Sequence, residues 1–123
     1  MTFTIEGAPR TKKNSQRIAR VKGRPIVLQS RQHDAWAQGA ILQLRSQWRR
    51  CDWAVDFAVN LRAHVYRDRA VGDLLNYLAA VSDALEAAGV VANDRLIVSL
   101  DGSRLLVDRA RPRVEIELSP VEE

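Results

Sequence analysis

Hydrophobic and polar residues alternate most regularly in the middle of the chain, between Val55 and Val65. Apolar side chains fall on nearly every second position there, and polar ones such as Asn60 and Arg62 fall between them. Successive side chains of a strand point to opposite faces, so this period of two predicts a strand with one buried face. Shorter patterns of the same kind predict strands at 2–6, 95–100, 104–107 and 114–118, with Asp101-Gly102 as a turn.

Two longer segments repeat apolar residues at every third or fourth position, which is the period of an amphipathic helix. The first is expected to run from a Ser30 cap to about Arg50, with its tryptophans in the core. The second is expected to run from about Asp73 to Ala88, and Gly89 follows it as a terminator. Each helix therefore has one face to bury against a sheet.

A basic hairpin is predicted near the N-terminus, where residues 17–21 and 25–28 flank Lys22-Gly23-Arg24. The resulting order of elements is β(β)–α–β–α–β–β. No repeat, low-complexity tract or linker interrupts this order. We therefore expect a single α+β domain over residues 1–123, with two main helices packed on a mixed β-sheet.

The composition of the chain narrows the classes of protein to which it can belong. Its 123 residues, 46% apolar and 28% charged, suit one globular domain rather than a disordered chain. No apolar run approaches the ~20 residues of a membrane span, so no membrane partner is expected. Residues 1–5 alternate like a strand rather than a secretion signal, and the single cysteine, Cys51, excludes an internal disulfide. These features favour a cytoplasmic protein.

Charge is distributed unevenly along the chain, although the net charge is only +4. Residues 1–50 contain eleven Lys and Arg but two carboxylates, whereas residues 51–123 contain eight Lys and Arg and thirteen carboxylates. A basic block neutralises phosphates and releases counterions, so a nucleic acid is the first partner to consider. The alternative is a solubilising surface loop. The densest basic stretch comprises Arg10, Lys12, Lys13, Arg17, Arg20, Lys22 and Arg24.

Carboxylates that suit metal chemistry lie around the second predicted helix. Asp73 is at its start, and Asp94 comes from the loop that follows it. Asn76 and Asp83 lie on its polar face, about two turns apart. Mg²⁺ prefers oxygen ligands and is usually held by one or two carboxylates with waters and substrate phosphates, so Asp73 and Asp94 are candidate ligands. The alternatives are a helix cap for Asp73 and turn chemistry for Asp94.

A longer motif runs from Gly72-Asp73-Leu74-Leu75-Asn76 through Asp83-Ala84-Leu85 to Ala88-Gly89-Val90 and Asn93-Asp94. Together with Lys12-Lys13-Asn14-Ser15, Gly23-Arg24-Pro25 and the stretch Asp101-Gly102-Ser103-Arg104, this order resembles the RusA family of Holliday-junction resolvases. The last three stretches also look like members from phages and prophages. The resemblance covers nearly the whole chain, from about Phe3 to Leu118.

The resemblance implies a homodimeric, Mg²⁺-dependent endonuclease, with Mn²⁺ as the alternative ion, that nicks four-way DNA junctions symmetrically in recombination and repair. It places the catalytic, metal-binding aspartates at Asp73 and Asp94, and Asn76 and Asp83 fall on supporting motif positions. In-line attack of water on phosphorus then leaves a 5′ phosphate. Two subunits present two such centres to opposed strands of the junction.

The chain departs from the family pattern at two positions of the central motif. That pattern is Asp-x-Asp-Asn, but Leu75 stands at the second aspartate and Ala79 stands where the family has a lysine. Leucine cannot ligate Mg²⁺, and the missing lysine removes a cation near the scissile phosphate. Asp101 is a candidate third metal ligand, and Arg69 or Arg104 is a candidate replacement cation.

Three functions are therefore compatible with the sequence. The first is a junction-resolving endonuclease, and the second is a catalytically impaired relative that binds branched DNA without cutting it. The third is a general nucleic-acid-binding module whose basic segment only contacts phosphates. The expected DNA-binding residues are Arg10, Lys12, Lys13, Asn14, Arg17, Arg67, Arg69 and Arg104.

Overall fold

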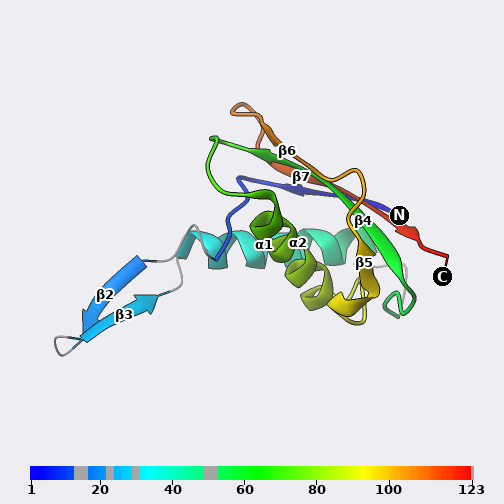
Figure 1. The fold of residues 1–123 in the computed structure, drawn as a ribbon, viewed down its shortest axis with the longest axis horizontal. Coiled ribbons are helices and arrows are strands. Elements are labelled where there is room, and N and C mark those ends of the chain that lie inside the picture. Colours follow the sequence, from blue (N-terminus) through cyan, green and yellow to red (C-terminus); the bar gives the residue numbers. More distant parts are fainter. Residues whose placement is uncertain (13–16, 22–23, 29–30, 49–52, 123) are drawn as a thin grey trace.

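A mixed five-stranded sheet forms the centre of the protein in the computed structural model (Figure 1). Its middle strand is β4 (Val59–Arg67). On one side β4 pairs antiparallel with β7 (Arg113–Pro120), which pairs antiparallel with β1 (Thr2–Glu6) at the edge. On the other side the first residues of β4 pair in parallel with β5 (Ile97–Ser99), and its last residues pair in parallel with β6 (Arg104–Val107).

The structure describes residues 1–12, 17–21, 24–28, 31–48 and 53–122, and describes residues 17–21 and 24–28 through their backbone alone. Within these ranges β2 (Arg17–Val21) and β3 (Arg24–Leu28) pair antiparallel as a separate hairpin that stands apart from the main sheet (Figure 1). The predicted basic hairpin is therefore present.

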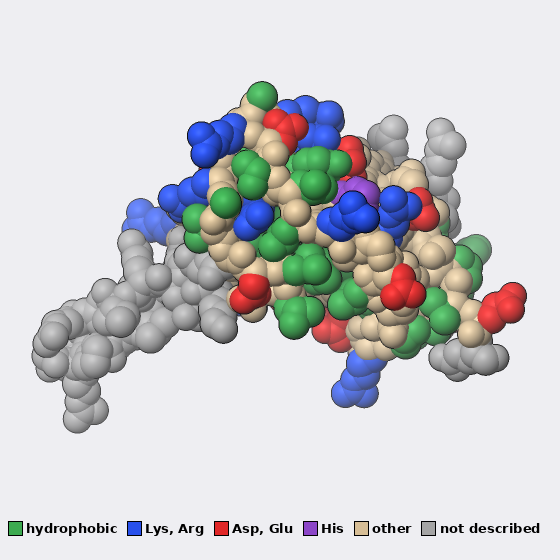
Figure 2. Space-filling view, turned by 45° about the horizontal axis from the view of Figure 1, so that its top comes forward, with side chains coloured by type: hydrophobic (Ala, Val, Ile, Leu, Met, Phe, Trp, Pro, Cys, Tyr) green, Lys and Arg blue, Asp and Glu red, His purple; other side chains and the backbone are tan. Residues whose placement is uncertain are grey.

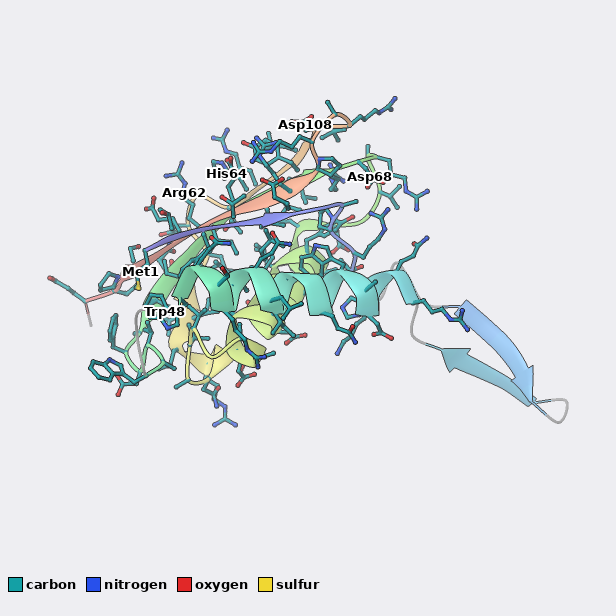
Figure 3. All side chains as sticks on the ribbon, turned by 180° about the vertical axis from the view of Figure 1, so that it is seen from behind. Met1, Trp48, Arg62, His64, Asp68 and Asp108 are labelled. Carbon is teal, nitrogen blue, oxygen red and sulfur yellow. The ribbon has the colours of Figure 1, made fainter. Side chains whose placement is uncertain are left out.

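Both helices cover the same face of the sheet. α1 (Arg31–Trp48) lies in front in Figure 3 and behind α2 (Leu74–Ala87) in Figure 1. The core lies between these helices and the sheet, because each element presents its apolar face to that layer. Its fully buried members include Ile5, Leu44, Val59, Leu61, Val65, Val81, Leu85, Val114 and Leu118.

Amide side chains of α1 satisfy the free edge of β1. Gln47 donates to the carbonyl of Thr4 at 2.8 Å and accepts its N–H at 2.9 Å. Gln43 likewise donates to the carbonyl of Glu6 at 3.1 Å and accepts its N–H at 2.7 Å. Because an unpaired strand edge is a template for pairing with another chain, these side chains close one edge of the sheet while they attach α1 to it.

The main elements predicted from hydrophobic periodicity are present, but the central strand begins later than its alternation suggests. Val55 lies outside the sheet and bridges Val91 instead, with its N–H bonded to Val90 and its carbonyl to Ala92, each at 2.9 Å. Phe57, expected on the buried face, is 46% exposed. The prediction of a strand from Val55 is therefore wrong for its first four residues, because the backbone of Val55 bonds to the segment after α2 and β4 begins only at Val59.

The segment predicted as a strand from 95 to 100 is also shorter than expected. It begins with a single 3₁₀ turn, η1 (Asp94–Leu96), and only Ile97–Ser99 join the sheet as β5. Within the described residues, no helix is long and apolar enough to cross a membrane.

Candidate active site

A groove of about 510 Å³ runs between α2 and the β5 edge of the sheet. Figure 2 shows the molecule tilted by 45° from the view of Figure 1. On this face exposed apolar side chains lie among charged ones of both signs. The groove has two carboxylates in an otherwise largely apolar lining. It is lined by Leu75, Leu78, Ala79, Ser82, Asp83, Asp94, Ile97, Val98, Ser99 and Leu100.

Asp94 enters this groove at the first position of η1. Asn93 precedes it as the cap, and its side chain accepts the N–H of Arg95 at 2.9 Å. The side-chain bond to the turn backbone that was considered for Asp94 is therefore made by Asn93. Asp94 is exposed, and its carboxylate makes none of the ion pairs found among the described residues.

Asp83 reaches the same groove from α2. Leu75, Ala79 and Asp83 follow one another at intervals of four residues, which places them on one ridge of the helix. All three line the groove. Asp83 is exposed and, like Asp94, has no ion-pair partner within the described part of the chain. The two positions at which the sequence departs from the RusA pattern thus border the groove that holds Asp83 and Asp94.

Asp73 is the N-cap of α2. Its Oδ1 accepts the backbone N–H of Asn76 at 3.1 Å, and its backbone is extended, with φ of −116° and ψ of 158°. This bond satisfies one of the N–H groups that a helix start leaves unpaired. Asp73 is exposed but does not line the groove. The structure therefore establishes a capping role for Asp73 and leaves its metal-binding role a prediction.

The loop that leads to Asp73 is fixed by side chains from the folded body. Arg67 donates to the carbonyls of Val71 at 3.2 Å and Leu106 at 3.3 Å. The hydroxyl of Tyr77 donates to the same Val71 carbonyl at 2.9 Å, and burial raises the pKa of this phenol. Arg67, expected to bind DNA, is thus committed to backbone carbonyls that position the start of α2.

Arg10, also expected to bind DNA, forms a forked ion pair with Asp68, which is labelled in Figure 3. Its two terminal nitrogens lie 2.9 and 3.0 Å from the two carboxylate oxygens. These hydrogen bonds lower the pKa of Asp68 and raise that of Arg10. The pair joins the N-terminal segment to the loop before α2, so its charges are already neutralised by each other.

Asp101 lies in the predicted turn, where Asn60 binds its backbone. The side chain of Asn60 accepts the N–H of Asp101 at 2.8 Å and donates to its carbonyl at 3.2 Å. Gly102 follows with a φ of +84°, which favours glycine. Asp101 does not line the groove. Among the described residues, no three His, Cys, Asp or Glu side chains are grouped closely enough to hold a metal ion.

A family comparison bears on these positions. The sequence model described as endodeoxyribonuclease RusA matches residues 6–119. The chain belongs to the RusA family. No curated protein matches it in a sequence search. Membership of the RusA family implies an endonuclease that resolves Holliday junctions, and nucleases of this family are in general dependent on divalent metal ions. The α+β architecture agrees with the RusA fold.

The two carboxylates of the groove fit a divalent ion that also binds water and substrate phosphate. Asp83 and Asp94 supply hard oxygen donors, and neither pairs with a cationic side chain that the structure describes. Mg²⁺ is commonly held by two carboxylates or fewer, because waters and substrate phosphates complete its octahedron. The grouping of only two carboxylates in the groove is therefore compatible with an ion that binds together with its substrate.

The structure describes the side chains of some of the remaining basic residues but not of others. Arg69 and Arg104 are exposed but do not line the groove, and Lys12 is exposed beside α2. Lys13 and Asn14 lie outside the described residues, as does the side chain of Arg17. The role of these residues in DNA binding stays a prediction.

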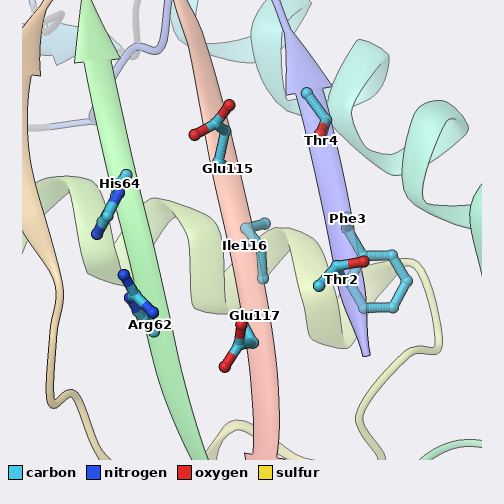
Figure 4. A pocket seen from close by; sticks show the side chains of 8 residues that line it. All are labelled: Thr2, Phe3, Thr4, Arg62, His64, Glu115, Ile116 and Glu117. Carbon is cyan, nitrogen blue, oxygen red and sulfur yellow. The ribbon is translucent and has the colours of Figure 1, made fainter.

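A second hollow, of about 300 Å³, lies on the face of the sheet that the helices leave open (Figure 4). Arg62 and His64 of β4 stand beside Glu117 and Glu115 of β7 there, in the register of the two strands. Arg62 and Glu117 are cross-strand neighbours of opposite charge, and such pairs stabilise a sheet. This surface therefore has a sufficient structural explanation.

Sequence reasoning named Asp83 only as a supporting residue and did not distinguish Arg10 and Arg67 from cations free to bind DNA. The interval of four between Ala79 and Asp83 was the available signal for the groove. No comparable local signal existed for the two arginines, because their partners are distant along the chain.

Proposed function

We propose that this protein is a divalent-metal-dependent endonuclease that cuts four-way DNA junctions through the groove between α2 and β5. The observation that carries the proposal is that Asp83 and Asp94, both exposed and without ion pairs among the described residues, line one groove of a RusA-family chain. Action on junction DNA in recombination and repair agrees with the expected cytoplasmic location.

In this proposal Asp83 and Asp94 hold Mg²⁺, or Mn²⁺ in its place. The ion, when bound, lowers the pKa of water and neutralises charge on the phosphodiester during in-line displacement. Asp94 is placed by the Asn93 cap of η1 and Asp83 by the third turn of α2, so both carboxylates are carried by ordered backbone. Asp73 contributes its Oδ1 to the helix cap, and its other oxygen is a further candidate ligand.

Mg²⁺-dependent nicking of a synthetic four-way junction tests the proposal. The wild-type protein should nick the junction with Mg²⁺ and not with EDTA. Asp94→Asn and Asp83→Asn should each reduce the single-turnover rate by about 10³-fold, because loss of a ligand charge removes stabilisation of the transition state. Asp56→Asn is the matched control, since Asp56 is exposed and lies outside the groove.

Two results would overturn the proposal. One is a wild-type protein that binds the junction but does not nick it with Mg²⁺ or Mn²⁺. The other is nicking that persists at the wild-type rate in both Asp94→Asn and Asp83→Asn. Asp73→Asn belongs in the same series, because it separates a ligand role from the cap: asparagine also caps helices but carries no charge.

A second candidate function is the binding of branched DNA without cutting. The observation that favours it is Leu75, which is 70% exposed in the groove where the family pattern has an aspartate. The first turn of α2 has no acidic residue, so Asp at this position is compatible with the helix dipole. If this reading holds, the double variant Leu75→Asp/Ala79→Lys should nick where the wild-type protein does not.

The proposal includes a homodimer, since two centres are needed for two opposed strands. Large apolar side chains that are exposed outside the groove, among them Trp53 and Phe57, are compatible with a protein surface that meets a partner. Light scattering coupled to size exclusion should give twice the 13.8 kDa chain mass. A monomer at micromolar concentration, both alone and with junction DNA, would contradict the homodimer.

A further inference from the structure

The residues that precede Lys12 are packed against the rest of the protein. Pro9 is buried, Arg10 is fixed by its forked pair with Asp68, and Thr11 is only 2% exposed. These three consecutive residues determine where the backbone of Lys12 lies. Its position is therefore a consequence of packing rather than of a free surface loop.

Lys12 is exposed and lies against the polar face of α2. It lines a hollow of about 110 Å³ together with Thr11, Asn76, Ala79, Ala80 and Asp83. Two of these residues, Ala79 and Asp83, also line the groove that holds Asp94. Lys12 and Asp94 thus border adjoining hollows that share one ridge of α2.

Among the basic residues whose side chains the structure describes, Lys12 is the one suited to this ridge. No described carboxylate lies within ion-pair distance of Lys12, whereas Arg10 pairs with Asp68. Arg69 and Arg104, the replacement cations expected from the sequence, line neither the hollow nor the groove. The small side chain of Ala79 leaves room between Lys12 and the groove.

From this placement we propose that Lys12 binds a substrate phosphate beside the groove, as a cation supplied by the N-terminal segment in place of a lysine on α2 at Ala79. Lysine suits this task because its ammonium is a point charge on a flexible stem and acts at a phosphate without a fixed geometry. The inference rests on the proposed function in taking DNA as the substrate.

The salt dependence of junction binding tests Lys12 independently of cutting. Fluorescence anisotropy with a four-way junction, in EDTA so that no strand is cut, gives the slope of log K against log salt. Lys12→Ala should reduce the magnitude of this slope by about 0.9, the value for one phosphate contact to duplex DNA. Lys12→Ala/Ala79→Lys should restore it, because the cation returns from the other side of the hollow.

Two controls show whether the effect depends on where the positive charge lies. One removes a charge elsewhere on the protein, and the other keeps a charge at position 12. Arg109→Ala removes one exposed positive charge from the β6–β7 loop, outside the groove and the hollow. It should change the slope by less than half as much as Lys12→Ala. Lys12→Arg keeps the charge and should keep the slope, so the result does not depend on correct folding of the double variant. The melting temperature of each variant reports on folding.

The same variants, assayed for nicking with Mg²⁺, separate this inference from the proposed function. Lys12→Ala should nick about 100-fold more slowly, as expected for one lost electrostatic contact at the reacting phosphate, and Ala79→Lys should rescue it. An unchanged slope in Lys12→Ala, or an equal loss in Arg109→Ala, would overturn the inference while leaving nicking intact. A Lys12-dependent slope in a protein that never nicks would support the phosphate contact and overturn the nuclease.

Discussion

The loop before α2 and the groove beside it contain the same kinds of residue in opposite circumstances. In the loop, Asp68 is paired with Arg10, Asp73 caps the helix, and Arg67 donates to backbone carbonyls. In the groove, Asp83 and Asp94 are exposed and have no ion pair within the described chain. A charged side chain that bonds to other groups of the protein stabilises the fold, whereas one without such a bond is available to a ligand.

This difference predicts that substitutions in the two regions separate stability from activity. Loop residues should affect folding because their removal takes away hydrogen bonds to backbone groups at the start of α2 and beside it. Groove carboxylates should affect chemistry and leave folding nearly unchanged, since no hydrogen bond or ion pair links them to another described side chain. The following expectations are ordered by the size of the effect.

The largest stability effect is expected for Arg67→Ala. The substitution leaves the carbonyl of Leu106 without its side-chain donor and the carbonyl of Val71 with the Tyr77 hydroxyl alone, which should lower the free energy of unfolding by about 2 kcal/mol. Urea unfolding followed by circular dichroism measures it. Arg67→Lys should recover part of the loss. A stability equal to wild type would show that these carbonyls need no donor and would break the comparison.

A smaller loss is expected for Asp73→Ala, which removes the acceptor for the N–H of Asn76. The free energy of unfolding should fall by about 1 kcal/mol, as for other N-cap substitutions. Asp73→Ser should restore it, because serine is also a good cap. If Asp73→Ser unfolds like wild type but nicks more slowly, Asp73 serves the metal as well as the helix.

The Arg10–Asp68 pair should make stability depend on pH at the acidic end. The pKa of Asp68 is lowered in the folded protein from an ordinary value of 3.8, so folding favours its ionised form. Its contribution is therefore fully present above about pH 4 and is lost as pH falls through the lower, folded value. The difference in unfolding free energy between wild type and Asp68→Asn should shrink between pH 5 and pH 2, and a constant difference would contradict the assignment.

The smallest stability effect is expected for the groove. Asp83→Asn and Asp94→Asn should leave the free energy of unfolding within about 0.5 kcal/mol of wild type, as for exposed residues without partners. The same urea titration measures it. A loss of 2 kcal/mol or more in either variant would show that the carboxylate has a structural partner and would sharpen the boundary between the two regions.

The periodicity of the sequence was sufficient to predict both helices and the order of the strands, because these patterns are local. Val55 shows where that reasoning fails: it alternates with Val59 and Leu61, but its backbone bonds go to residues 90–92. The site divides in the same way. Asp94 could be named from the motif, whereas the engagement of Arg10 by Asp68 depends on a contact between residues 58 positions apart.

The central claim is that Asp83 and Asp94 together hold a divalent ion, and paramagnetic broadening by Mn²⁺ tests it directly. In ¹⁵N-labelled protein bound to a four-way junction with a non-hydrolysable backbone, low Mn²⁺ should first broaden the amide signals of Asp83, Asp94 and Ser99, which line the groove. Asp94→Asn should abolish this selective broadening, and Asp56→Asn should not. Broadening centred elsewhere, or equally strong in Asp94→Asn, would contradict the account.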